Sequence, residues 1–191
     1  MHSKTPCVTN MDRGKPSRTP IRVPDALWPA LRSDHAGETG AVYIYRGVLS
    51  VTRDDEVICF AQHHLATERI HLELMEALVP PEQRSRLLPI WRVAGWLTGA
   101  LPALFGRAAV FRTIEAVETF VDGHYQEQTP QLANDPRFKE LHELLERCRL
   151  DEIAHREDAA GRLGEAGLPG RIWSALVDYG SRAGVALAAR L

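Results

Sequence analysis

Residues 150–157 read LDEIAHRE, and residues 67–71 read TERIH, so one Glu-x-x-His spacing occurs twice in the chain. Residues three apart on an α-helix lie about 60° apart around the axis and roughly 4.5 Å along it. Each pair therefore projects into nearly the same space. With 15 glutamates and eight histidines in 191 residues, chance predicts roughly 0.6 such pairs. Two pairs therefore predict one shared site.

The sequence around these motifs predicts an all-α fold. Apolar residues recur at intervals of three and four, and stretches of alternating polarity with β-branched residues are missing beyond residue 24. The long helices are expected at about residues 26–53, 54–79, 108–133 and 136–166. Each helix carries an apolar stripe that a carboxylate interrupts near its middle.

The interrupting carboxylates predict a metal site. Four buried, unpaired carboxylates would each cost several kcal/mol. Two divalent cations would cancel their charge, and each cation would gain one histidine nitrogen. One Glu from each of two helices with Glu-x-x-His from two others is typical of ferritin-like di-iron and di-manganese bundles. The predicted ligands are Glu38, Glu68, His71, Glu118, Glu152 and His155.

The two halves of the site repeat along the chain. The lone glutamate precedes its Glu-x-x-His motif by 30 residues in the first half (38 to 68) and by 34 in the second (118 to 152). This spacing indicates a repeated helical hairpin whose approximate symmetry brings the ligands together.

Other polar residues share these faces. His64, one turn before Glu68, is interpreted as a supporting or structural histidine. Asp34 and Asp151 are candidates to orient the ligating histidines, because a metal-bound imidazole usually donates its other N–H. Glu115 is the alternative ligand in the third helix, but it lies off the stripe of Glu118.

Three glycines in the first helix, Gly37, Gly40 and Gly47, weaken it by about 1 kcal/mol each relative to alanine. We expect these glycines to allow another helix to approach closely at the site.

The chain reads as one domain, residues 24–191, after a disordered tail, residues 1–23, rich in Pro, Ser, Thr and basic residues. A net charge of −2 gives no support to nucleic-acid binding. The prolines at 16, 20 and 24 interrupt any amphipathic helix and make the tail a poor transit peptide, which favours a bacterial protein.

An apolar connector, IWRVAGWLTGALPALFG, occupies residues 90–106. It is too short to span a bilayer and contains Pro102. It either lies in a membrane interface with its aromatic residues at headgroup depth, or crosses the bundle as a packed hairpin. Residues 170–191 predict a C-terminal helix that extends this surface or caps the bundle.

Five segments together resemble the demethoxyubiquinone hydroxylase family of ubiquinone biosynthesis. These segments are DHAGETGA (34–41), TERIH (67–71), the connector, AVETFVDGHY (116–125) and LDEIAHRED (150–158). The resemblance covers about residue 31 to the C-terminus, and DHAGE followed by a glycine is its most distinctive piece.

The resemblance implies a carboxylate-bridged di-iron monooxygenase with two Fe ions per chain, which uses O2 to hydroxylate the ring of a polyprenyl demethoxybenzoquinol. It implies that Glu68 and Glu152 bridge the irons, with Glu38 and Glu118 as the other catalytic carboxylates, and that His124 and Tyr125 contact substrate or a proton path. The expected location is peripheral, on the cytoplasmic side of a bacterial inner membrane or the matrix side of the mitochondrial inner membrane. Other proteins of ubiquinone biosynthesis are the expected partners.

Two rival functions stay open on the sequence. A ferritin-like ferroxidase or iron store shares the ligands but needs no apolar connector. A non-enzymatic helical interaction module would leave the Glu and His residues solvated.

Overall fold

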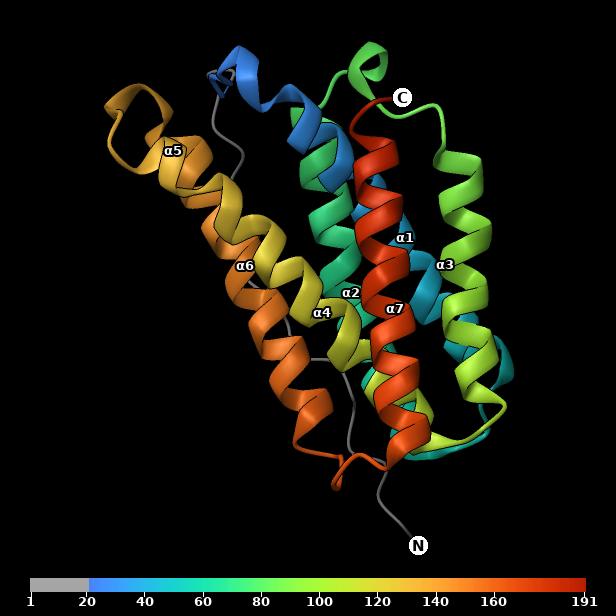
Figure 1. Cartoon of the computed structure of the whole chain (residues 1–191). Coiled ribbons are helices and arrows are strands. Elements are labelled where there is room, and N and C mark those ends of the chain that lie inside the picture. The colour runs from blue at the N-terminus through green and yellow to red at the C-terminus, as the bar shows by residue number, and fades with distance from the viewer. Residues whose placement is uncertain (1–20) are drawn as a thin grey trace, which may run out of the picture.

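The protein is a bundle of long helices. A computed structural model describes residues 21–191, and within that range it contains no strand (Figure 1). The predicted all-α, ferritin-like class is confirmed. The long helices are α1 (Trp28–Val51), α2 (Asp55–Leu78), α3 (Leu88–Ala103), α4 (Arg107–Gln128), α6 (Lys139–Ala160) and α7 (Leu168–Ala188). The short elements are η1 (Asp25–Leu27), η2 (Pro81–Gln83), α5 (Pro130–Ala133) and η3 (Pro136–Phe138).

Local signals set the helix ends. The Asp54 side chain caps α2 by accepting hydrogen bonds from the backbone N–H groups of Glu56 and Val57. Thr129 separates α4 from the short α5, as the proline that follows it predicts. The fourth predicted helix was too long, because α6 ends at Ala160 and not at residue 166. Glycines at 161, 164 and 167 favour a loop there.

Two apolar cores bracket the middle of the bundle. One gathers buried residues from α1, α2 and α4, among them Tyr45, Phe60 and Phe111. The other gathers residues nearer the opposite end, among them Leu31 and Leu145. Along each of the four core helices, the interrupting carboxylate lies between these cores, which hold it away from solvent.

The edge of the second core includes residues from the predicted tail. Ile21 and Val23 are half-buried against it. The rest of the tail expected to be disordered, residues 1–20, lies outside the described residues.

The connector forms α3, which packs backbone to backbone on α1. A Cβ atom at Gly99 would overlap the Ile44 carbonyl, and one at Gly47 would overlap the Trp96 carbonyl. A Cβ at Gly40 would lie 2.9 Å from the Trp91 ring. The predicted close approach of α1 is therefore real, but its partner is α3 and not the metal site. Gly37 has open space where a Cβ would lie.

The outer face of α3 remains exposed and apolar. Ile90 is 63% exposed and Val93 is 62% exposed, and in the turn that follows α3 Phe105 is 82% exposed. The inner face of α3 thus agrees with the packed alternative for the connector. The membrane-interface alternative stays a prediction. No helix in the described part of the chain is long and apolar enough to cross a bilayer.

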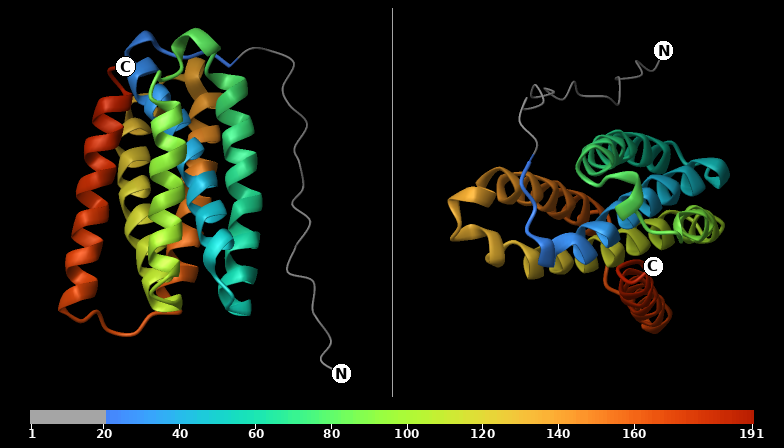
Figure 2. Two further views of the ribbon diagram at one scale, coloured as in Figure 1. Left: turned by 90° about the vertical axis from the view of Figure 1, so that its right-hand side faces the viewer. Right: turned by 90° about the horizontal axis from the view of Figure 1, so that it is seen from above.

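Helix α7 stands beside the bundle, outside the four core helices (Figure 2). It packs on α4 and α1, and the Trp173 indole N–H donates a 2.7 Å hydrogen bond to the Thr113 hydroxyl. Its one fully buried residue is Ala188. The helix therefore covers the bundle without being enclosed by it.

Candidate metal centre

The structure brings the six predicted ligands together in the bundle interior. Their exposed fractions lie between 0% and 4%. They form two overlapping groups, each with one possible ligand atom per residue within 4.8 Å of the others. The groups are Glu38, Glu68, His71 and Glu152, and Glu68, Glu118, Glu152 and His155.

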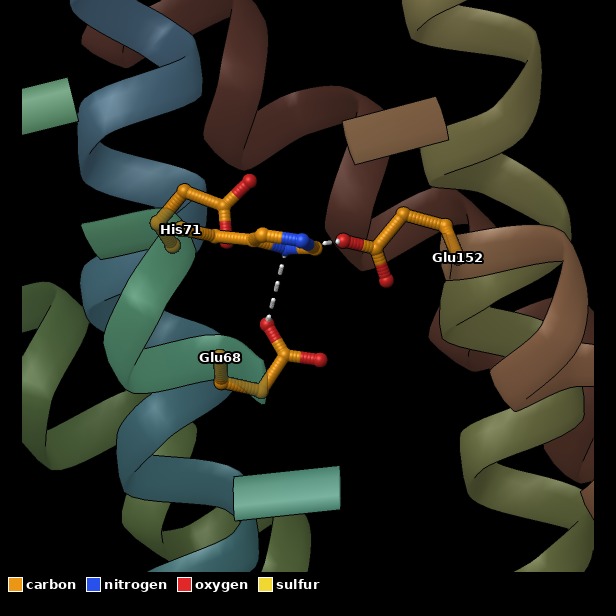
Figure 3. Close-up of side chains that lie close together, drawn as sticks. Glu68, His71 and Glu152 are labelled. Carbon is orange, nitrogen blue, oxygen red and sulfur yellow. Dashed lines mark hydrogen bonds and ion pairs between the residues drawn. The ribbon is translucent and has the colours of Figure 1, made fainter. Parts of the chain in front are cut away.

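One Glu-x-x-His motif lies on α2 and the other on α6, and the two motifs face each other. Figure 3 shows His71 pointing from α2 toward Glu152 on α6, with Nδ1 2.9 Å from Glu152 Oε1. In return, His155 Nδ1 lies 2.9 Å from Glu68 Oε1. Each histidine therefore approaches the glutamate of the other motif. Because Glu68 and Glu152 belong to both groups, they lie where a carboxylate would bridge two ions.

Several polar atoms in this cluster lack hydrogen bonds within the described structure. They are both carboxylate oxygens of Glu68, Glu152 Oε2 and His155 Nδ1. His155 Nδ1 lies close to Glu68 Oε1 and Glu152 Oε2, but these contacts lack hydrogen-bond geometry. Buried polar groups are almost always paired, because an unpaired one costs about 1–3 kcal/mol. A cation among these atoms would satisfy them, so the donor set fits a metal.

The pKa shifts of Glu38 and Glu118 also fit a metal site. Burial raises the pKa of Glu38 well above its usual value, and the charges of Glu152 and Glu68 act in the same direction. Burial and the same two carboxylates raise the pKa of Glu118. Positive charge among these side chains would reverse both shifts by stabilising the ionised carboxylates.

Two tyrosines hold the lone glutamates crosswise. The Tyr125 hydroxyl of α4 donates a 2.7 Å hydrogen bond to Glu38 Oε1 on α1. The Tyr45 hydroxyl of α1 donates a longer one, 3.4 Å, to Glu118 Oε1 on α4. The sequence analysis did not single out Tyr45. The available signal was its place seven residues after Glu38, which Tyr125 repeats after Glu118.

The two aspartates predicted to orient ligating histidines differ. Asp151 lies as expected, with Oδ2 3.0 Å from His71 Nε2. Asp34 does not contact a predicted ligand: its Oδ1 lies 2.9 Å from His124 Nε2 and accepts a 2.9 Å hydrogen bond from Gln128. The expectation for Asp34 was wrong, because its side chain reaches α4 and not the histidines of α2 or α6.

His64 and Glu115 fall outside both metal groups. His64 Nε2 lies 2.9 Å from Asp158 Oδ2, and its ring packs against His155 with centroids 4.3 Å apart. Burial, with the nearby His155, lowers the pKa of His64 to about 4. Glu115 is half-buried and pairs with Arg112 at 3.6 Å. The structural interpretation of His64 and the choice of Glu118 over Glu115 agree with this geometry.

A cavity of about 370 Å³ opens onto the cluster. Its walls come from α1, α3, α4 and α7, and Glu38, Glu118 and Tyr125 are among the residues at its surface. The lining is mostly apolar, with residues such as Ile90 and Val177. The pair of Asp34 and His124 adds a polar group to this wall.

Comparisons with known proteins agree with this site. The family model described as ubiquinone biosynthesis protein COQ7 matches residues 25–188. The 3-demethoxyubiquinol 3-hydroxylase of Rhodospirillum rubrum is 39% identical over 131 residues, which cover 66% of this chain and 60% of that protein. The mitochondrial NADPH-dependent 3-demethoxyubiquinone 3-hydroxylases of Dictyostelium discoideum and Homo sapiens are 34% and 30% identical, and each match covers 84% of this chain and 76% of the relative.

The matched region thus spans between about three-fifths and three-quarters of these relatives. The resemblance seen in the sequence motifs is confirmed, since the family model covers all six clustered residues. The chain therefore belongs to the COQ7 family of ubiquinone biosynthesis proteins.

Proposed function

We propose that this protein is a di-iron monooxygenase that hydroxylates the ring of a polyprenyl demethoxybenzoquinol with O2. The observation that carries the proposal is a buried set of four carboxylates and two histidines that opens into an apolar cavity. The named activities of the relatives supply the substrate class. An iron store needs no such cavity, and solvated side chains in an interaction module would not be buried.

The ligand assignment follows from the two groups. Glu38 and His71 would hold one iron, Glu118 and His155 would hold the other, and Glu68 and Glu152, which belong to both groups, would serve both. Oxygen-rich ligands suit iron in its higher oxidation state. Iron held there supplies the electrons that activate O2.

The remaining steps belong to the side chains of this chain. The apolar lining of the cavity takes the substrate ring and excludes water from the cluster. His124, fixed by Asp34 and by Ser33 at 3.1 Å, is placed to orient a ring hydroxyl. The hydrogen bond from Tyr125 holds Glu38 at the inner end of the same cavity.

A turnover experiment tests the proposal. Iron-loaded protein is given a short-chain demethoxyubiquinol, a reductant and isotopically labelled O2, and the quinone is read by mass spectrometry. Labelled oxygen in a hydroxylated ring is expected. Iron oxidised with the quinol unaltered would reject the hydroxylase and favour the ferroxidase. Failure to bind metal would favour the interaction module.

We further propose that the protein attaches peripherally to a membrane, by the exposed apolar residues of α3, of the turn that follows it and of α7. A polyprenyl tail partitions into lipid, and the cavity lies between these two helices. The face includes Ile90, Val93, Leu97, Leu101, Leu104, Phe105, Leu168, Ile172 and Leu176. The cytoplasmic side of a bacterial inner membrane is the proposed place, and the matrix side of the mitochondrial inner membrane is the alternative, since several relatives are named as mitochondrial.

Liposome flotation tests this attachment. The double variant Leu104→Ser with Phe105→Ser should lose flotation that wild type shows, since both side chains are largely exposed and should not alter the fold. Leu150→Ser is the matched control, because Leu150 is 56% exposed on α6, away from this face. Wild type that stays at the bottom with every lipid composition would reject the attachment.

A further inference from the structure

The two metal positions share Glu68 and Glu152 but receive unequal support from the residues around them. One position adds Glu38 and His71, and the other adds Glu118 and His155. An approximate repeat relates the positions, so each supporting contact can be compared with its counterpart.

The histidines differ in what holds the nitrogen that faces away from the metal. His71 Nε2 lies 3.0 Å from Asp151 Oδ2. For His155, the only carboxylates within 4 Å among residues 21–191 are Glu68 and Glu152, and both approach Nδ1. The counterpart of Asp151, one residue before the motif glutamate, is Thr67. A carboxylate acceptor fixes the imidazole ring and makes it a more basic ligand.

The two lone glutamates also differ in how firmly a neighbouring tyrosine holds them, and the better-held one again belongs to the position of His71. Tyr125 holds Glu38 at 2.7 Å, the usual length of an O–H···O bond, whereas Tyr45 approaches Glu118 at 3.4 Å. A short bond from a buried hydroxyl fixes the carboxylate before metal binds. Both better-supported ligands therefore belong to one position.

We infer that the two positions bind metal unequally, and that the position of Glu38 and His71 binds a divalent cation more tightly and fills first. This inference rests on the proposed metal centre. Removing an outer partner of a ligating histidine typically weakens metal binding by about 10- to 100-fold. A difference of at least about tenfold between the positions is therefore expected.

Cobalt(II) titration of the metal-free full chain, followed by calorimetry and visible absorption, tests the inference. Wild type should show a tight step and a weaker step. His155→Ala should keep the tight step, and His71→Ala should keep only the weak one. Asp151→Asn should weaken the tight step by about 10- to 100-fold. This variant keeps the test open if a histidine variant does not fold, because the Asp151 side chain is 48% exposed.

The control is Glu157→Gln, an exposed acid on the same helix, which should leave both steps unchanged. Two equal steps in wild type would overturn the inference while leaving the metal centre intact. Loss of the tight step in His155→Ala but not in His71→Ala would also overturn it. A wild type that binds no cobalt would reject the metal centre itself.

Discussion

The hairpin of α1 and α2 and the hairpin of α4 and α6 are alike at the metal cluster and unlike beyond it. Each supplies a lone glutamate, a tyrosine seven residues later and a Glu-x-x-His motif. Four residues before the lone glutamate, however, the first half has Asp34 and the second has Ile114. Six residues after it, the first half has Ile44 and the second has His124.

These differences add a polar pair and an apolar pair to the interior. Asp34 meets His124 at the cavity wall. Ile44 and Ile114 share an apolar core, and Ile44 also lines the cavity. The repeat is thus maintained among the six clustered residues. It is broken where Asp34 and His124 form a polar pair and where Ile44 and Ile114 add to an apolar core.

The largest expected effect comes from removing a residue that both positions share. Glu152→Ala should lower bound iron from two per chain to one or none, and should lower hydroxylation by at least about 100-fold, because the metal supplies the reactive chemistry. Iron analysis and turnover measure both. Glu115→Gln, a half-buried α4 variant outside both groups, is the control. A Glu152→Ala protein with two irons and full activity would show that the ligands are misassigned.

The next effect compares a glycine at the contact of α3 with the first half and a glycine on an open face of the second half. Gly99→Ala should lower the free energy of unfolding by about 3 kcal/mol or more, since the new methyl group meets α1 backbone that cannot move aside. Gly123→Ala on α4 meets no atom within 4 Å, and should stabilise the helix by up to about 1 kcal/mol. Urea denaturation measures both. Equal stabilities would mean that α3 is not in backbone contact with α1.

The smallest effect concerns His35, which is fully buried in the first half, whereas its counterpart in the second half is only half-buried. His35 is 1% exposed, whereas its counterpart Glu115 is half-buried in an ion pair. Burial, with Arg84 and Arg92, lowers the pKa of His35 from 6.5 to about 4. Between these pH values the unfolded chain binds a proton that the folded chain does not, so stability falls as pH falls.

His35→Gln removes this titration. Relative to the variant, wild type should lose at most about 3 kcal/mol of unfolding free energy between pH 6.5 and pH 4. Urea denaturation of the metal-free proteins across this range provides the measurement. Parallel pH curves for the two proteins would contradict the shift.

Much of the site could be predicted from sequence because helical spacing is local. The Glu-x-x-His pairs and the apolar stripes are enough to assign all six clustered residues to inner faces of their helices. The partner of Asp34 could not be found this way, since His124 lies 90 residues further along the chain. Only the packing of α1 on α4 brings the two side chains together.

The connector shows a second limit of sequence reasoning. Its glycines at 95 and 99 and its large apolar residues fit a packed helix and an exposed one equally well. The choice depends on α1, whose own glycines at 40 and 47 accept the α3 backbone. The length of the fourth helix was overestimated because its stripe continues to Leu163, while the glycines after Ala160 favour the loop.

The single fully buried residue of α7 has a consequence for how the cavity exchanges its contents. Local opening occurs where few apolar contacts must break. A cavity should therefore open first at the helix in its wall that is least enclosed. Helix α3 is joined to α1 along its backbone. Helix α7 is held by partly buried residues such as Val177, by Ala188 and by the Trp173 hydrogen bond. Amide hydrogens of α7 should therefore exchange with solvent faster than those of α3, and we expect the cavity to open first on the side of α7.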